Sequence, residues 1–571
     1  MAITTSLDSH STSPPGRRTK SADVVIGLAV LYWLLQVVWF WQYCGHNINA
    51  DSISYIGIAR HIEDGNFQAS LHGYWSPLIS WLIASASRMG NDHTRIARLL
   101  MLPLFALCLI LIYCFTQRLW ASRLMSALAV FWFAAARGIA AFSVCFIGAD
   151  LLLTAAVLVY FALLLGCLEQ PREGSRWTAL GFAHGVAFLA KAIAMPLLAF
   201  TTALAVLSVF GRTPKQAVRS VILAAIFPSL IWVSWGVALR QKYGEFTTGY
   251  QLRWNLLDPA VKQAPDKGSG LLMLHDARAS YDSYMVADAM PPGSRFWQAP
   301  VSSPTLLRRI MRKEIENIPQ AGKELLVLLT PGGILAFILC LIQLTRHRRN
   351  YPAHFRLVWI VLFTTLALTL AYAMLVFDGR YVVPVTPILM AFAIRFALPP
   401  GKAKAPPSQD LVRSGRWQSA AGALIVLGLI AVQIYWASPF RTIRQDFQSS
   451  VYDAANALTE GQARTVVAIG DGPYPEHGVG WEAGIYASYF AGSQIVADLI
   501  DKPSVVNSDS IVIDIERLSP DAVIIWGSPT DSLGTTLVRE LQVAYPHDSS
   551  TIIRDPRRGE VATVVILKDK G

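Results

Sequence analysis

Several charged residues of this sequence stand where chemistry at a membrane surface would need them. Asp51 follows the first long apolar segment, Asp150 follows Gly148-Ala149 at the start of another, and Arg380 stands near the start of a third. A carboxylate at such a place could take a proton as a general base, and the planar donors of a guanidinium group suit a phosphate. The sequence therefore suggests a site that combines base catalysis with anion binding.

The stretch from Asn49 to Arg60 predicts a helix with Asp51 near its start. Tyr55 and Ala59 follow Asp51 at i+4 and i+8, so these three residues share one face of the helix. Asp51 has two interpretations. It is either a cap that the helix dipole stabilises or the general base of a site at the membrane surface.

Asp150 and Lys191 also have ordinary interpretations. A carboxylate is costly within a membrane and usually marks function or lines a water-filled cavity, but Asp150 could be a helix-start residue at the interface. Lys191 lies between two apolar segments and could be a snorkelling lysine. Arg380 lies on the side of the membrane where topology does not call for a charge, which favours a binding role.

Other chemical signatures in the sequence are weak. His184 inside an apolar segment and His275 and His477 in polar regions are isolated, and isolated histidines are more often structural or solvated than metal ligands. The sequence has no Ser/His/Asp arrangement, no phosphate-binding glycine motif and no cluster with metal-ligand spacing. A divalent metal therefore has no clear ligand set, and the cofactor stays unknown. All six cysteines lie in or beside apolar segments, so no disulfide framework is expected.

The elements that must position these residues are membrane helices. Hydrophobic residues make up 53% of the 571 positions and charged residues only 15%, which is typical of a protein with lipid as its solvent. The net charge of +11 comes from short basic clusters between apolar segments, so it indicates membrane orientation and no nucleic-acid partner. About eleven apolar segments are candidates for spanning a bilayer. They are 24–43, 96–116, 122–141, 148–168, 177–190, 192–210, 218–239, 322–344, 355–376, 381–398 and 419–438.

The basic clusters also predict orientation and domains. If the N-terminus lies inside, every predicted inner loop carries Lys or Arg, as the positive-inside rule requires, and an odd number of spans places the C-terminus outside. We expect a multi-pass protein of the cytoplasmic (inner) membrane. Its domains would be a cytoplasmic tail over 1–23, a transmembrane domain over 24–439 with outer loops at 44–95 and 240–320, and an extracytoplasmic domain over 440–571.

The outer segments have recognisable patterns. Residues 44–95 predict two interfacial helices, Asp51–Asp64 and Tyr74–Met89, and the second outer loop ends in an amphipathic segment, Pro304–Ile318. The C-terminal region alternates strand-like and helical patterns, which predicts a small α/β domain. The expected strands are 464–470, 494–499, 521–527 and 561–568, and the expected helices are 481–490 and 510–518.

Two stretches resemble the first outer loop of GT-C fold glycosyltransferases. In one, Asp51 is followed by Tyr55 and Ala59-Arg60; in the other, Gly73-Tyr74-Trp75-Ser76-Pro77-Leu78 opens the second interfacial helix. The likeness is greatest to glycosyltransferase family 39, which includes protein O-mannosyltransferases and lipid A aminoarabinose transferases, and it covers about residues 24–400. Two departures weaken the expectation of a metal site of the aminoarabinose-transferase type. Ala-Asp-Ser replaces Gly-Asp-Glu, and His72 and Trp75 stand near the proline, where some members have an acid.

The resemblance implies a polytopic α-helical, GT-C-like membrane protein with a small C-terminal α/β domain. It implies that Asp51 is the general base and that Asp150 is a second acid that orients the acceptor or the base. It further implies that Lys191 and Arg380 contact the donor phosphate, because Arg380-Tyr-x2-Pro-x2-Pro is similar to the family's motif. The candidates for substrate binding are Tyr55, Arg60, His72 and Tyr74.

The predicted location of the site restricts the reaction. An outer-face enzyme cannot use cytoplasmic nucleotide sugars, so we expect a polyprenyl-phosphate sugar as donor, a glycolipid, glycan or protein as acceptor, and membrane lipids as surroundings. One base with no evident nucleophile favours inversion at the anomeric carbon. The alternative is a membrane transporter or lipid flippase for a glycolipid. Transporters often have two halves of matching hydropathy, whereas this sequence shows no such repeat and carries its charged candidates at segment ends.

Overall fold

The computed structural model describes most of the chain. The described residues are 18–44, 48–88, 90, 92–136, 138–210, 213–247, 249, 251, 272–273, 304–374, 379–397, 422–435, 449–470, 473–474, 478–499, 508–526, 532–545, 549–555 and 559–567. The predicted tail over 1–23 therefore lies mostly outside them, and the predicted boundary at residue 440 lies wholly outside.

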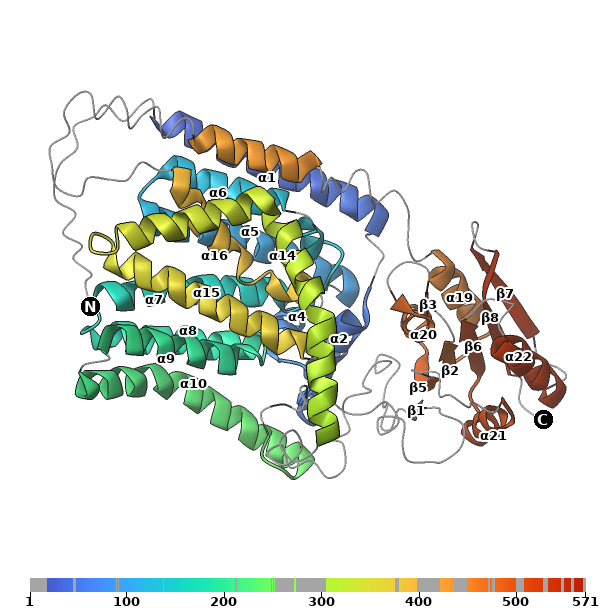
Figure 1. Cartoon of the computed structure of the whole chain (residues 1–571). Coiled ribbons are helices and arrows are strands. Elements are labelled where there is room, and N and C mark those ends of the chain that lie inside the picture. The colour runs from blue at the N-terminus through green and yellow to red at the C-terminus, as the bar shows by residue number, and fades with distance from the viewer. Residues whose placement is uncertain are drawn as a thin grey trace.

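A bundle of apolar helices forms the larger part of the structure (Figure 1). Each of the eleven predicted segments overlaps a helix. The helices are α1 (Arg18–Cys44), α5 (His93–Trp120), α6 (Arg123–Ala135), α7 (Asp150–Glu169), α8 (Gly174–Ala190), α9 (Ala194–Phe210), α10 (Pro214–Tyr243), α14 (Pro304–Arg346), α15 (Pro352–Ala373), α16 (Thr386–Ala393) and the helix Gly422–Tyr435. Six of them, α1, α5, α7, α10, α14 and α15, contain a stretch that is long and apolar enough to cross a membrane.

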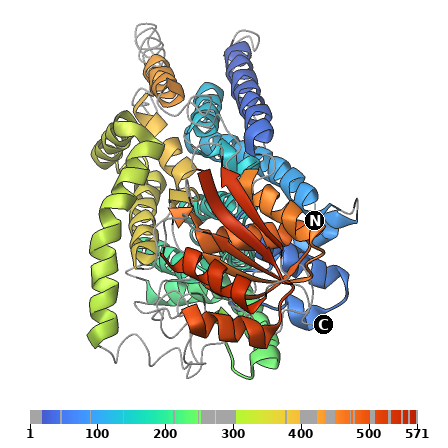
Figure 2. The ribbon, with the colours of Figure 1, turned by 90° about the vertical axis from the view of Figure 1, so that its right-hand side faces the viewer.

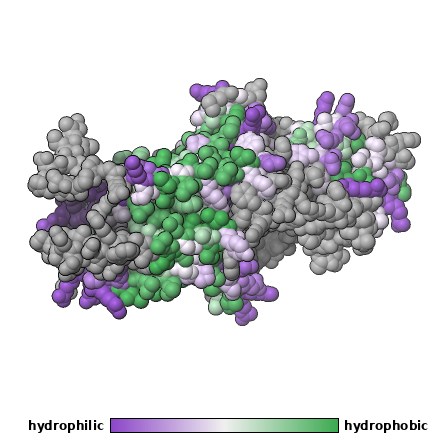
Figure 3. Space-filling model, turned by 90° about the horizontal axis from the view of Figure 1, so that it is seen from above, coloured by the Kyte–Doolittle hydropathy of each residue, from purple (hydrophilic) through white to green (hydrophobic). Residues whose placement is uncertain are grey.

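The surface and the interior of the bundle are both apolar. Figure 3 shows hydrophobic side chains over the helices and hydrophilic ones gathered toward the ends. Large side chains such as Trp132, Tyr160 and Trp177 are fully buried between the helices. An apolar exterior around an apolar core suits lipid as solvent. The chain is therefore a multi-pass membrane protein, as predicted.

Helix α14 differs from its prediction, because it begins at Pro304 and not near residue 322. The amphipathic segment Pro304–Ile318 continues directly into the apolar one. Inside the apolar part, the backbone is non-helical at Thr330, where φ is 61° and ψ is 158°, just before Pro331. Proline cannot donate the helical hydrogen bond and restricts the residue before it, so the helix bends there (Figure 1).

Short elements cover the end of the bundle that carries the predicted outer segments. They are α2 (Ala50–Glu63), α3 (Phe67–Ser70) and α4 (Leu78–Ser87), with the 3-10 turns η1 (Ala140–Ser143) and η2 (Gly379–Val382). The turn η3 (Ile394–Ala397) lies at the other end, where the Arg395 guanidinium is 5.3 Å from the ring of Trp120, the last residue of α5. The first predicted interfacial helix corresponds closely to α2. The second was predicted to begin at Tyr74 but begins at Leu78, because Pro77 is its N-cap and residues 73–76 form a turn.

The C-terminal region folds around a six-stranded sheet that Figure 2 shows in front of the bundle. The strand order is β1-β5-β2-β6-β8-β7. Strands β5 (Gln494–Leu499), β2 (Thr465–Gly470) and β6 (Ala522–Trp526) are parallel to one another, and β8 (Gly559–Ile566) and β7 (Ser549–Asp555) are antiparallel. The accompanying elements are α19 (Ser449–Glu460), α20 (Gly480–Ala491), α21 (Ser508–Leu518), α22 (Ser532–Ala544) and the hairpin β3 (Pro473–Tyr474) and β4 (Gly478–Val479).

The small α/β architecture was predicted, and so were β2, β5, β6, β8, α20 and α21. Strand β1 (Leu272–Met273), from the predicted second outer loop, pairs antiparallel with β5 and was not predicted. Strand β7 was not predicted either, because its sequence is mostly polar. Helices α19 and α22 were also missed, although their buried residues recur at helical spacing, as Val451, Ala454 and Leu458 do in α19.

Candidate active site

Asp51 lies in the first turn of α2 but does not cap the helix. Asn49 is the N-cap, and its side-chain oxygen accepts a hydrogen bond from the backbone N–H of Ser52 at 2.9 Å. The Ser52 hydroxyl donates to the carbonyl of Ile147 at 3.0 Å, which ties the start of α2 to the segment before α7. The capping interpretation of Asp51 is therefore wrong, and its carboxylate is available for another contact.

That contact is an ion pair with Arg380. Nη1 of Arg380 donates to Oδ2 of Asp51 at 2.7 Å, and 26% of the Asp51 side chain and 18% of the Arg380 side chain remain exposed. Arg380 stands in η2, which follows α15, and its guanidinium carbon lies 5.2 Å from the centroid of the Tyr381 ring. The general-base candidate and the phosphate-binding candidate therefore touch each other.

Asp150 and Lys191 form a second and more buried pair. Nζ of Lys191, which follows α8, donates to Oδ1 of Asp150, the first residue of α7, at 2.6 Å. Only 12% of the Lys191 side chain and 7% of the Asp150 side chain are exposed. Burial alone would lower the pKa of the Lys191 ammonium, but the charge of Asp150 together with Tyr372 and Tyr381 outweighs it, so this pKa is raised. Lys191 is thus a buried cation and not a snorkelling residue.

Aromatic rings connect the two pairs. Tyr372, near the end of α15, stacks on Tyr381 with 3.9 Å between ring centroids and 4° between planes. The Lys191 ammonium lies 4.9 Å from the Tyr381 ring and 5.8 Å from the Tyr372 ring, so cation–π attraction contributes to holding it. Tyr381 thereby contacts both cations, and it was the part of the Arg380-Tyr motif that carried no predicted role.

The two pairs line one pocket of about 40 Å³. Tyr55 and Tyr74, both predicted to bind substrate, line it too. Tyr55 is buried, packs edge-on against Trp75 at 5.3 Å, and has its hydroxyl pKa raised by that burial. The full lining is Asp51, Tyr55, Tyr74, Trp75, Ser76, Gly148, Ala149, Asp150, Lys191, Gln251, Arg380 and Tyr381.

Two predicted substrate-binding residues lie elsewhere. Nδ1 of the buried His72 accepts hydrogen bonds from the backbone N–H groups of Tyr74 at 3.0 Å and Trp75 at 3.4 Å, so His72 shapes the turn before α4. The Arg60 guanidinium lies 5.7 Å from the ring of Tyr489 in α20, against the C-terminal sheet domain. Thr94 joins this contact through a hydrogen bond of 2.7 Å to the Tyr489 hydroxyl.

Histidines and metal ligands add little to the site. His184 bonds to the carbonyl of Met195 at 3.0 Å inside the bundle, whereas His275 and His477 lie outside the described residues. Among the residues that the structure describes, no three His, Cys, Asp or Glu side chains are placed to hold a metal ion together. Asp51 and Asp150 each face a cation, so the described site does not fit a metal.

Comparison with known proteins places this geometry in a fold. No protein-family model and no curated protein sequence matches the chain. The structure of ArnT from Cupriavidus metallidurans in the apo state matches with a TM-score of 0.51 at 13% identity, covering 96% of this chain and 98% of that one. Its structure bound to undecaprenyl phosphate matches with a TM-score of 0.50 at 12% identity and the same coverage. The Archaeoglobus fulgidus oligosaccharyltransferase in complex with Zn and sulfate matches with a TM-score of 0.51 at 11% identity, covering 94% of this chain and 72% of that one.

These proteins are GT-C fold glycosyltransferases. The chain has the GT-C fold. This confirms the fold class predicted from residues 51–60 and 73–78. At such low identity the likeness shows the fold alone, so the roles of individual residues rest on the geometry. In this GT-C chain, two carboxylates and two cations meet in one pocket between α2, α7, η2 and the α8–α9 turn. That set can accept a proton and bind an anion within one small volume.

Proposed function

We propose that this chain is a glycosyltransferase that moves a sugar from a polyprenyl-phosphate carrier to an envelope acceptor. The observation that carries the proposal is the joint position of Asp51, Asp150, Lys191 and Arg380 in one pocket. The fold supports it, since ArnT in its complex with undecaprenyl phosphate is a structural relative. No feature of the described residues specifically favours the transporter or flippase alternative.

The reaction is a single displacement at the anomeric carbon. Asp51 takes the proton of the acceptor hydroxyl, the acceptor oxygen forms its bond to the anomeric carbon, and the bond from that carbon to the phosphate oxygen breaks. The electron pair leaves with the polyprenyl phosphate, whose growing charge Arg380 and Lys191 stabilise. Attack from the face opposite the leaving group inverts the configuration, and no covalent sugar–enzyme intermediate is needed.

The Asp51–Arg380 pair has to loosen when the donor binds. A pocket of about 40 Å³ has room for a few water molecules but not for a sugar phosphate. Arg380 has donors on several nitrogens, so a phosphate can take over the contact that Asp51 now holds. Donor binding then provides the phosphate with its cation and frees the base in one rearrangement, which favours an order in which the donor binds first.

The proposal includes an orientation and a place in the cell. The N-terminus lies in the cytoplasm, and the pocket and the C-terminal domain lie on the outer face of the cytoplasmic membrane. The acceptor is a glycolipid, a glycan or a protein of the cell envelope. The C-terminal domain stands beside α2 through the Arg60–Tyr489 contact, close enough to shape the acceptor's path.

The experiment has two steps. Mass spectrometry of envelope glycolipids and glycans from a deletion strain identifies the missing sugar and its acceptor. The purified protein in lipid nanodiscs then receives the corresponding polyprenyl-phosphate sugar and the acceptor isolated from the deletion strain. We expect restored transfer with release of polyprenyl phosphate. Unchanged envelope glycans, together with no loss of sugar from any carrier offered, would refute the proposal.

A further inference from the structure

A groove of about 470 Å³ lies between α9 and α15, near the loop that joins α14 to α15. This loop is at the end of the bundle away from the C-terminal sheet. The apolar lining includes Leu204 of α9 and Phe355, Trp359 and Phe363 of α15. These three α15 residues repeat at i+4, so they form one face. Adjacent rings also pack on each other, with centroids 6.5 Å and 6.1 Å apart.

The groove is accessible from outside the bundle. Phe363 is 46% exposed and Leu207, beside the groove on α9, is 66% exposed. Both helices have apolar sequences, and α15 is long and apolar enough to span a membrane. An open apolar groove at such a place faces lipid chains and not water.

Two arginines line the same groove. Arg348 comes from the α14–α15 loop, and Arg356 lies in the first turns of α15, beside the aromatic face. No acidic side chain lines the groove. Neither guanidinium forms an ion pair or a side-chain hydrogen bond with another residue in the part of the chain that the structure describes. The groove therefore combines an apolar wall with two uncompensated positive charges.

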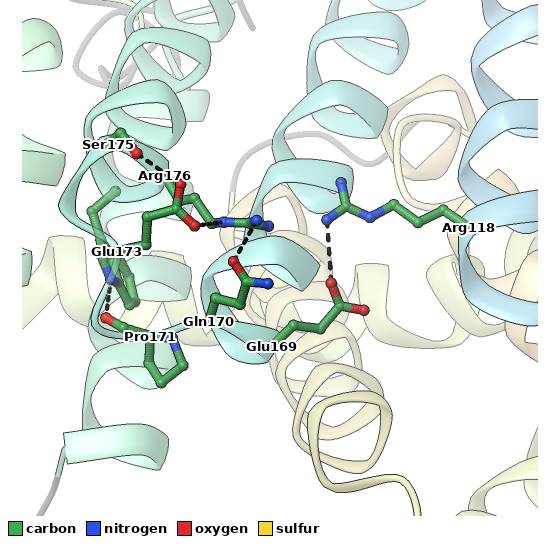
Figure 4. Close-up of polar contacts among 8 residues, drawn as sticks. Arg118, Glu169, Gln170, Pro171, Glu173, Ser175 and Arg176 are labelled. Atoms are coloured by element: carbon green, nitrogen blue, oxygen red, sulfur yellow. Dashed lines mark hydrogen bonds and ion pairs between the residues drawn. The ribbon is translucent and has the colours of Figure 1, made fainter. Parts of the chain in front are cut away.

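Two other arginines at this end of the bundle are compensated. Arg118 pairs with Glu169 at 3.3 Å, and Arg176 pairs with Glu173 (Figure 4). His354, near the start of α15, forms a hydrogen bond of 3.0 Å with the carbonyl of Leu119, the residue next to Arg118. The paired arginines and the start of α15 therefore lie at the same end of the bundle. Other arginines at this end, such as Arg219 of α10 and Arg349 of the α14–α15 loop, also form no ion pair among the described residues. The groove is therefore distinguished by the combination of two arginines with an aromatic wall.

We propose that this groove binds one anionic phospholipid, with the phosphate on Arg348 and Arg356 and an acyl chain along Phe355, Trp359 and Phe363. Guanidinium groups suit a phosphate, and basic pockets between transmembrane helices are the usual sites for acidic headgroups. In the proposed orientation the lipid belongs to the cytoplasmic leaflet, on the opposite side from the candidate active site. This site is independent of the proposed transfer reaction.

Native mass spectrometry tests the proposal on the full-length protein, delipidated in detergent and titrated with phosphatidylglycerol or phosphatidylcholine of identical acyl chains. We expect one tightly retained phosphatidylglycerol and a preference over phosphatidylcholine of about tenfold or more. Each arginine near an anionic headgroup is expected to contribute about fivefold to this preference. Arg348→Gln/Arg356→Gln should abolish the preference. The control Lys215→Gln/Arg219→Gln removes the same amount of charge from exposed positions on α10 and should leave the preference for phosphatidylglycerol unchanged.

A further variant separates a groove from a diffuse charge effect. Ser208→Trp, also in the groove lining, fills the apolar channel and keeps both arginines, so it should weaken retention of the lipid. Equal retention of the two lipids by the unaltered protein would overturn the proposal. Equal losses in the α10 and groove charge variants would overturn it too, because the binding would then follow net charge. Full retention in Ser208→Trp would likewise exclude the groove as the place of binding.

Discussion

Replacing Asp51 with Asn separates its role in the reaction from its role in the fold. The change removes a proton acceptor but keeps the shape of the side chain, and the amide oxygen can still accept the hydrogen bond from Arg380. Asn49 caps α2, so the helix keeps its cap. Loss of a general base in this way should lower the rate of transfer by about 10²- to 10⁴-fold.

The structural cost of Asp51→Asn is smaller. The pair with Arg380 is partly exposed, so its loss should destabilise the protein by about 1 kcal/mol or less, and losing a first-turn charge adds about 0.3–1 kcal/mol. The rate loss corresponds to about 3–5 kcal/mol of transition-state stabilisation. The effect on turnover should therefore clearly exceed the effect on stability.

The assay measures sugar transfer by the purified protein together with its thermal midpoint. Asp51→Glu keeps the acid but moves it by one methylene group, so its rate should be intermediate. Asp64→Asn makes the same chemical change at the exposed end of α2, outside the pocket, and should have a normal rate. Near-normal turnover in folded Asp51→Asn would refute the assignment of the base and make Asp150 the next candidate.

Three further predictions follow from the same pocket and fold. Arg380→Ala should raise the KM for the donor far more than the KM for the acceptor, with Arg380→Lys intermediate, and normal kinetics of both at limiting donor would show that Arg380 is only an interface anchor. Asp150→Asn should destabilise the protein by about 3–5 kcal/mol because it leaves Lys191 buried without its partner, and adding Lys191→Met should recover much of this loss; additive losses in thermal unfolding would contradict the pairing. A topology reporter after Phe440 should be active only outside the cytoplasm and one at Lys402 only inside, and the reverse pattern would place the pocket on the wrong side for the proposed donor.

The positions of the membrane helices and of much of the C-terminal domain could be predicted from the sequence. Continuous apolar segments and alternating strand patterns are local signals, so helices such as α5 and α7 and strands such as β2 and β5 could be located from them. The ends were less predictable where two patterns merge without a break, as in α14, or where one proline decides the start, as in α4.

The site was predictable as a set of residues but not as a set of contacts. Asp51 and Arg380 are far apart in the chain. The sequence indicates that each lies beside one end of an apolar segment, but it does not indicate which segment ends lie next to each other in the fold. Arg60 illustrates a signal that was available. At about 3.6 residues per turn it lies two and a half turns past Asp51, so it points away from the face that carries Asp51 and Tyr55. Helical spacing alone could have removed it from the pocket.

Strand β1 has a consequence for how the C-terminal domain is made. Its residues, Leu272 and Met273, are synthesised well before β5, the strand with which they pair. Such a distant pairing forms late because a long loop has to close, so the edge of β5 stays open until the membrane helices between them are in place. A fragment that begins at residue 449 lacks β1 and exposes that edge permanently, and unprotected edges pair with other chains. The isolated domain should therefore aggregate more readily than the same domain joined to its second outer loop.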